Sequence, residues 1–270
     1  MTADKATPAT PPDGPPAPAP LSLCYRDAQL VVIDKPPGLL VHRTALDRHE
    51  TRFAVQLLRD QIGQRVTPVH RLDRGTSGVL VFALDAETTR TLSAEFATQR
   101  VHKTYLAVVR GWPAEQGTID HPLQRQPDDA EWQDARAENR PQEAVTHWRR
   151  LATVELPLAN DRHPTSRYAL LELTPETGRR HQIRRHLKHI AHPIIGDATY
   201  GKGAHNRAFA AHTGCARLLL HCAGMRFTHP ATGDALHMTA PLSGDFQQLL
   251  HTLGWQEAAR RFAAVVNSPA

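Results

Sequence analysis

Cysteines, aromatic residues and long apolar runs are all scarce in this sequence of 270 residues. The three cysteines (Cys24, Cys215 and Cys222) are too few and too scattered for a disulfide framework or a zinc knuckle. No stretch approaches the roughly 20 apolar residues that a membrane span requires, and the first residues lack the apolar segment of a secretion signal. We therefore expect reduced thiols and a cytoplasmic protein with no membrane partner.

Basic residues outnumber acidic ones, and they are concentrated in one segment. The formal net charge is +5. Residues 178–196 contain four arginines and a lysine but no acidic residue, whereas acidic residues gather at 128–138. Such segregated positive charge suits a polyanionic partner such as a nucleic-acid backbone.

The chain divides into a short tail and one long folded region. Residues 1–20 hold seven of the 21 prolines, so we expect a disordered tail, followed by a single domain over 21–270. Strands and helices are predicted to interleave without a βαβ rhythm, which favours an α+β fold with a mixed sheet. The predicted strands are 29–34, 39–42, 79–84, 104–110, 145–154 and 168–173. Helices are predicted at 52–61, at 86–99 with Asp85 as N-cap, after Gly178 and around Phe246–Leu253, and a polar loop at 124–142.

The densest group of chemically active side chains is HRLDRGTSG at residues 70–78, directly before a predicted buried strand. It places one carboxylate, Asp73, between Arg71 and Arg74. A carboxylate near fixed cations favours its charged form, and it can act as a nucleophile or stabilise positive charge. On residue types alone the structural alternative is favoured, in which Asp73 pairs with a neighbouring arginine to hold a loop.

A second group is GRRHQIRRH at residues 178–186. On a helix, Arg180, Arg184 and Lys188 would lie along one side, next to an apolar stripe that includes Ile183. That side could pair with a buried carboxylate and with phosphates, and the alternative is a solvent-exposed basic face. The histidines here lack the i, i+4 spacing of metal ligands, so we expect no metal site.

Taken in order, these motifs resemble one enzyme family. Residues 70–78 resemble the motif that carries the catalytic aspartate in pseudouridine synthases of the ribosomal large subunit synthase A family. Other segments match that family in the same order, and several ordered motifs are far more specific than one short pattern. These segments are 35–38, 103–105, 144–147, 178–186 and 192–197. A closer likeness, at 40–43, 46–48 and 59–64, is to a branch of the family that acts on uridine-65 of tRNA.

The resemblance implies the fold and the chemistry. The expected fold is α+β, with a mixed, mostly antiparallel sheet flanked by helices around a central RNA-binding cleft. The implied reaction isomerises a flipped-out uridine of tRNA, with no cofactor, no metal and no obligatory protein partner, in a monomer. Asp73 would attack ribose C1′ or uracil C6, Arg184 would pair with Asp73, and Tyr105 would stack on the uracil and help to remove a proton.

The resemblance also implies substrate contacts. Arg71 would fill the space that the flipped nucleotide leaves, and Ile183 would pack against the base. His70, Arg180 and Lys188 complete the predicted RNA-binding set. Two alternatives stay open from the sequence: a ribosomal RNA substrate, and an RNA-binding protein without catalytic activity.

Overall fold

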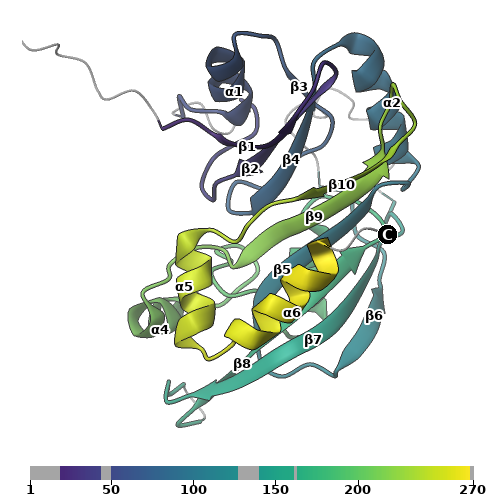
Figure 1. Cartoon of the computed structure of the whole chain (residues 1–270). Coiled ribbons are helices and arrows are strands. Elements are labelled where there is room, and N and C mark those ends of the chain that lie inside the picture. The colour runs from purple at the N-terminus through teal and green to yellow at the C-terminus, as the bar shows by residue number, and fades with distance from the viewer. Residues whose placement is uncertain (1–18, 44–49, 127–139, 161–162, 268–270) are drawn as a thin grey trace, which may run out of the picture.

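The computed structural model describes residues 19–43, 50–126, 140–160 and 163–267 (Figure 1). Residues 1–18 of the predicted tail, the motif segment 46–48 and most of the predicted loop at 124–142 lie outside the described residues. The described strands are β1 Ser22–Arg26, β2 Leu30–Lys35, β3 Thr67–Pro68, β4 Ser77–Ala83, β5 His102–Arg110, β6 Gln116–Asp120, β7 Val145–Leu156, β8 Ser166–Pro175, β9 Leu220–Thr228 and β10 Ala235–Thr239. The described helices are α1 Ala54–Ile62, α2 Ala86–Ala97, α3 Gln182–His189, α4 Gly203–Thr213, α5 Gly244–Thr252 and α6 Gln256–Asn267.

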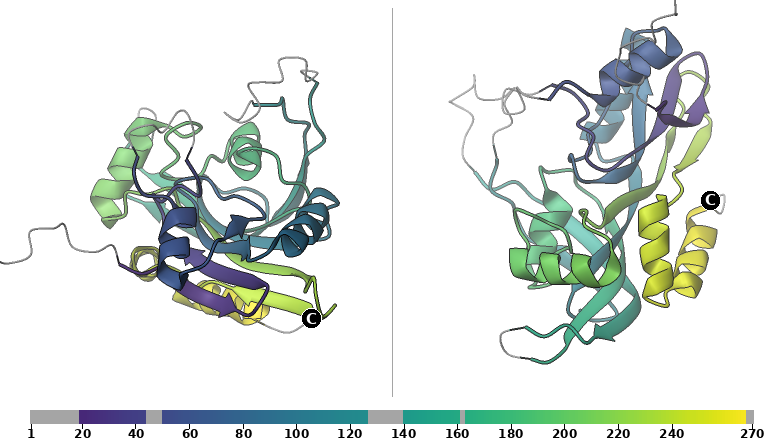
Figure 2. Two further views of the ribbon diagram at one scale, coloured as in Figure 1. Left: turned by 90° about the horizontal axis from the view of Figure 1, so that it is seen from above. Right: turned by 90° about the vertical axis from the view of Figure 1, so that its left-hand side faces the viewer.

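The described strands form one mixed sheet in the order β1-β2-β4-β9-β5-β8-β7-β6, with β10 added to β9 and β3 to β4. The β4–β9 pair is parallel and the other pairs are antiparallel, which confirms the predicted mixed, mostly antiparallel α+β fold. Helices α5 and α6 lie on one face of the sheet, and α3 and α4 lie on the other (Figures 1 and 2). Within the described ranges, no helix combines the length and the apolar character that a bilayer crossing demands.

Local signals place several elements correctly. The continuous apolar run in β4 is buried at every position, as expected for a strand covered on both faces. Asp85 caps α2, because its side chain accepts a hydrogen bond from Thr88 N at 2.7 Å. These elements depend on residues within a few positions of one another, which is why the sequence pattern suffices to predict them.

The predicted strand at 39–42 is wrong. Only Leu40 forms an isolated bridge there, with Phe53. The carbonyls of Leu40 and Val41 accept hydrogen bonds from Ala54 N (2.8 Å) and Val55 N (3.1 Å) at the start of α1. The segment therefore pairs with the chain entering a helix and adds no strand to the sheet.

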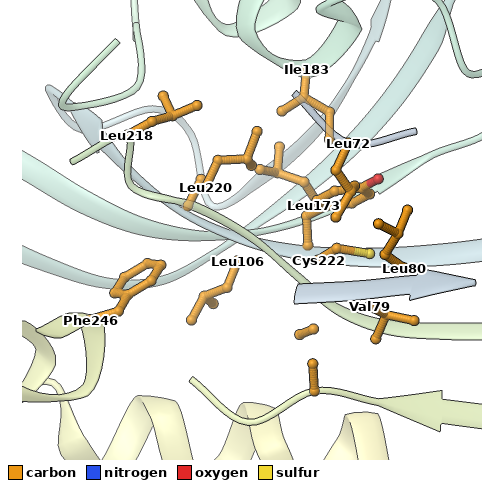
Figure 3. Close-up of a cluster of buried hydrophobic side chains, with 14 of the residues drawn as sticks. Leu72, Val79, Leu80, Leu106, Leu173, Ile183, Leu218, Leu220, Cys222 and Phe246 are labelled. Carbon is orange, nitrogen blue, oxygen red and sulfur yellow. The ribbon is translucent and has the colours of Figure 1, made fainter. Parts of the chain in front are cut away.

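The core lies at the centre of the sheet, directly beneath the motif at 70–78. Figure 3 shows Leu72 and Ile183 at one side of this cluster and Phe246 at the other. Gly78 pairs with Cys222 in the parallel contact between β4 and β9 and has a φ of +111°, and a Cβ atom there would lie 2.1 Å from the carbonyl oxygen of Cys222. Glycine is required because both the backbone angle and the close approach exclude a side chain.

Candidate active site

Backbone hydrogen bonds fix the loop that carries Asp73. Thr76 N donates to the carbonyl of Asp73 (3.0 Å), which closes a tight turn directly before β4. The carbonyl of Arg74 accepts hydrogen bonds from Gly38 N (2.8 Å) and from the ammonium of Lys35 (3.2 Å). Two of the sequence motifs therefore form one unit, which presents an Asp73 side chain that is 21% exposed.

Arg184 of α3 supplies a cation that holds Asp73. Its Nη1 lies 2.9 Å from Asp73 Oδ2, and only 8% of the residue is exposed. Arg74, a sequence neighbour of Asp73, forms an ion pair with Glu50 at 2.5 Å. The fold thus joins two motifs that lie 111 residues apart, and the position of Asp73 does not depend on adjacent arginines alone.

A second carboxylate, Asp197, fixes the other edge of the Arg184 guanidinium. Its two oxygens accept hydrogen bonds from Arg184 Nε (2.7 Å) and Nη2 (2.9 Å) and from the backbone amides of Thr199 and Tyr200 (both 2.9 Å). Burial alone would raise the pKa of Asp197, but the hydrogen bonds from Arg184 and the amides outweigh it and hold that pKa below its usual range. Because Asp197 clamps Arg184 in this bidentate way, the remaining Nη1 is directed at Asp73.

Helix α3 begins later than the sequence pattern predicts. His181 is left-handed, with a φ of 54°, and Gln182 is the first helical residue. The side chain of Gln182 also accepts a hydrogen bond from the backbone of the preceding turn at 2.9 Å, which stabilises this start. The predicted helical row of Arg180, Arg184 and Lys188 is therefore wrong at Arg180, which precedes the helix; Arg184 is buried and Lys188 is exposed.

The left-handed turn brings His181 to the candidate site. Its Nε2 lies 3.7 Å from Asp73 Oδ1, and its Nδ1 lies 3.0 Å from the hydroxyl of Tyr200. Burial lowers the pKa of His181, the charge of Asp73 opposes this shift, and the charge of Arg184 adds to it. The imidazole of His181, which lies beside Asp73, is therefore neutral near neutral pH.

A cavity of about 370 Å³ opens beside Asp73. Its lining brings together six of the predicted site residues: His70, Arg71, Asp73, Tyr105, Ile183 and Arg184. Neither Arg180 nor Lys188 belongs to the lining. Their predicted contacts with RNA would therefore have to lie outside this cavity.

A larger cavity, of about 690 Å³, lies elsewhere and contains none of the predicted residues. Arg110 at the far end of β5, Arg167 and Lys202 are among the residues that line it. Of these two cavities in the described residues, the smaller one is the candidate active site, because it places a carboxylate, a guanidinium and a phenol around one space.

Tyr105 forms one wall of the candidate site, and Ile183 lines the same cavity. The two residues are 9% and 7% exposed. Burial, together with the charge and hydrogen bond of Cys222, raises the pKa of Tyr105 well above its usual range. Burial likewise raises the pKa of Cys222 to about 12. Both groups are therefore neutral at physiological pH.

His70 supports the Asp73 loop from beneath. Its Nε2 accepts a hydrogen bond from Val81 N at 3.0 Å, and its ring stacks on Phe96 with centroids 4.7 Å apart. Burial lowers the pKa of His70 to about 3, and the charge of Lys103 contributes to the shift. A neutral ring is what this acceptor role needs, so His70 ties the loop to β4, and its contact with RNA stays a prediction.

Sequence reasoning did not assign a role to three residues of the site: Lys103, His181 and Asp197. Lys103 shares a strand face with Tyr105 at i, i+2, and this spacing could have identified it. Asp197 lies within a segment that matches the family, but the identity of its partner depends on the fold. In the part of the chain that the structure describes, no group of three His, Cys, Asp or Glu side chains is arranged to hold a metal ion.

Comparisons with known proteins identify the family. The sequence profile of the RNA pseudouridylate synthase family matches residues 29–189. The chain is 49% identical over 238 residues to tRNA pseudouridine synthase C of Vibrio cholerae, covering 88% of this chain and 98% of that protein. It is 48% identical to the protein of the same name from Yersinia pestis, covering 88% and 93%. The structure of human RNA pseudouridylate synthase domain containing 4 superposes with a TM-score of 0.65 at 27% identity, covering 86% and 93%.

Proposed function

Because this chain belongs to the RNA pseudouridylate synthase family, and is therefore an isomerase acting on RNA, we propose that its substrate is a uridine of tRNA. Relatives named tRNA pseudouridine synthase C support this choice, since they align over nearly their whole length. The resemblance of three further segments to the branch that acts on uridine-65 favours that position. The observation that carries the proposal is the Asp73 carboxylate, held by Arg184 in a cavity that Tyr105 and Ile183 also line.

The target uridine must leave its helical stack to reach Asp73. A cavity of about 370 Å³ has room for one nucleobase but not for a duplex, so the base is flipped outward before reaction. Arg71 is exposed and lines the cavity, which suits a side chain that occupies the space vacated in the RNA stem. Ile183 supplies an apolar contact for one face of the flipped base.

Asp73 is the nucleophile of the proposed reaction. In one route a carboxylate oxygen bonds to ribose C1′ while the C1′–N1 bond breaks and its electron pair passes to the uracil. The detached ring turns, C5 bonds to C1′ as the carboxylate leaves, C5 loses its proton and N1 gains one. In the other route a carboxylate oxygen bonds to uracil C6 and the C5=C6 electron pair passes to O4. The C1′–N1 bond then breaks, the ring turns and C5 bonds to C1′. Loss of the C5 proton expels the carboxylate from C6, and N1 gains a proton. Either route returns the carboxylate unchanged, so the net reaction is an isomerisation.

Tyr105 is the stacking platform for the uracil. Its raised pKa favours the neutral phenol, which preserves an aromatic face against the base. If Tyr105 also removes the C5 proton, the neutral hydroxyl must pass on its own proton as it accepts the new one. Asp197 acts through Arg184 as a positioning residue, because it orients the guanidinium that holds Asp73.

Two measurements test the proposal. Asp73→Asn should abolish pseudouridine formation in a tRNA transcript while leaving the Kd for that RNA within about threefold, because the amide cannot act as a nucleophile. Substantial residual turnover would refute the nucleophile assignment. Arg184→Ala should damage the rate more than the affinity, since it leaves the Asp73 carboxylate without this partner.

The substrate is tested by mapping pseudouridine in RNA from a strain that lacks the gene. Loss at tRNA position 65, restored by the wild-type gene but not by the Asp73→Asn gene, would support the proposed target. Loss confined to ribosomal RNA would refute it, and an unchanged map together with tight RNA binding would indicate a non-catalytic RNA-binding protein.

A further inference from the structure

Two buried lysines lie near Asp73, and they differ in how their ammonium groups are satisfied. Lys35 is fully buried, and its Nζ donates hydrogen bonds to the carbonyls of Pro36 (2.9 Å), Leu39 (2.8 Å) and Arg74 (3.2 Å). All three of its donors therefore have partners in the fold, and its task is to hold the loop.

Lys103 is the opposite case. It is 8% exposed and lines the cavity, and among the residues that the structure describes no hydrogen-bond acceptor or ion-pair partner is found for its Nζ. Burial lowers its pKa, which the nearby thiol of Cys222 partly offsets. The side chain is largely covered, but its Nζ is not among the buried atoms that lack a partner, so the ammonium faces the cavity with donors that a bound substrate can use.

The position of Lys103 identifies that partner. Lys103 and Tyr105 are two residues apart on β5, both line the cavity, and two strand residues span about 6.6 Å. A uracil stacked on Tyr105 therefore presents its edge within reach of the Lys103 side chain. A Cβ atom on Gly178 would lie 4.0 Å from Lys103 Nζ, so the absence of a side chain at Gly178 leaves room beside the ammonium.

Both routes open to Asp73 generate negative charge on the uracil. Breaking the C1′–N1 bond sends an electron pair into the ring, where it spreads over N1, O2 and O4. Addition to C6 moves an electron pair through C5 onto O4. The oxygen common to both routes is O4, and a hydrogen-bond donor fixed beside it in a cavity stabilises the transition state more than the ground state.

We propose that Lys103 is a catalytic residue of this enzyme, whose ammonium donates a hydrogen bond to uracil O4 as the detaching ring becomes anionic. The inference rests on the proposed function, because it needs a flipped uridine stacked on Tyr105. Lys103 gives up no proton in this role, and the charge it stabilises disappears when the ring rejoins the ribose through C5.

The test compares wild type with Lys103→Met, Lys103→Arg and the control Lys202→Met in single-turnover reactions on a saturating tRNA transcript. Lys103→Met should slow the reaction roughly 10²–10³-fold, the usual loss when one such donor is removed, with the Kd within about threefold. Lys103→Arg keeps a cationic donor and should retain more than a tenth of the rate. Lys202 is exposed at the start of α4, away from this cavity, and its variant should behave as wild type.

Stability separates catalysis from support of the fold. Methionine removes a buried charge without leaving a large void, so the Tm of Lys103→Met should equal or exceed that of wild type. A lower Tm accompanied by a proportional loss of activity would mean that Lys103 is structural, and the proposal would be overturned.

RNA chemistry supplies the final comparison. Replacing O4 of the target uridine with sulfur, a weaker acceptor, should slow the wild type and have little further effect on Lys103→Met. The alternative is that Lys103 binds a phosphate. Lys103→Met would then bind the RNA more weakly, with a salt dependence that corresponds to about one fewer released ion, and its rate on saturating RNA would be unchanged. That result would overturn the proposal. A wild type inactive on every RNA tested would refute the proposed function itself, whereas an active wild type matched by Lys103→Met would refute this inference alone.

Discussion

Replacing Asp197 by asparagine isolates the contribution of the carboxylate that positions Arg184. The side chain of Asp197 is fully buried and accepts four hydrogen bonds, two from Arg184 and two from backbone amides. Asparagine keeps the shape but has one acceptor oxygen, so its amide group must face a donor. It also removes a counter-charge from a guanidinium that is 10% exposed.

The magnitude follows from the burial of this pair. Removing one partner of a buried ion pair lowers the free energy of unfolding by about 3–5 kcal/mol. Asparagine keeps one acceptor oxygen and the hydrogen bonds made to it, so we expect Asp197→Asn to lose about 3 kcal/mol. For a protein of this size each kcal/mol shifts Tm by roughly 2–4 °C, so calorimetry should record a fall of roughly 6–12 °C. The single-turnover rate should fall as well, because Arg184 Nη1 is no longer directed at Asp73.

Asp60→Asn is the matched control, since it makes the same chemical change in the exposed Arg59–Asp60 ion pair, whose side chains are 53% and 66% exposed. It should change the free energy of unfolding by less than about 1 kcal/mol. Equal effects of the two substitutions, or an Asp197→Asn protein with wild-type Tm and rate, would refute the positioning role.

Three further perturbations test other parts of the structure. Gly78→Ala should lose about 3 kcal/mol or more in urea unfolding, because it combines a left-handed φ with a contact to the Cys222 carbonyl, whereas Gly63→Ala has open space and should lose about 1 kcal/mol. Burial lowers the pKa of His221 from 6.5 to about 4, so the unfolded chain binds this proton first and stability should fall from pH 6.5 towards 4. His221→Gln should remove about 1.4 kcal/mol per pH unit from that slope, and an unchanged slope would contradict the assignment. Lys188→Ala should weaken tRNA binding modestly and reduce its salt dependence in filter-binding titrations, and an unchanged salt dependence would exclude a phosphate contact.

The success of the predicted elements depended on how local their signals are. The buried strand β4 and the N-cap of α2 could be predicted from the sequence, because each depends on residues that are close together in the chain. Strand β9, at the centre of the sheet, was not predicted, since its sequence LHCAGMRFT mixes small, polar and apolar residues without alternation. Its burial on both faces comes from strands and helices elsewhere in the chain.

The sequence by itself determined the family, the reaction class and the residue types available for catalysis. The reason is that several separated motifs, including the one around Asp73, occur along the chain in the same order as in the family. The tertiary structure decided which of these residues meet. It placed Arg184 between Asp73 and Asp197, moved Arg180 out of the helix and buried Lys103 beside Tyr105. The contact between Arg184 and Asp73, across 111 residues, depends on strand pairing and chain closure, for which no single segment carries a local signal.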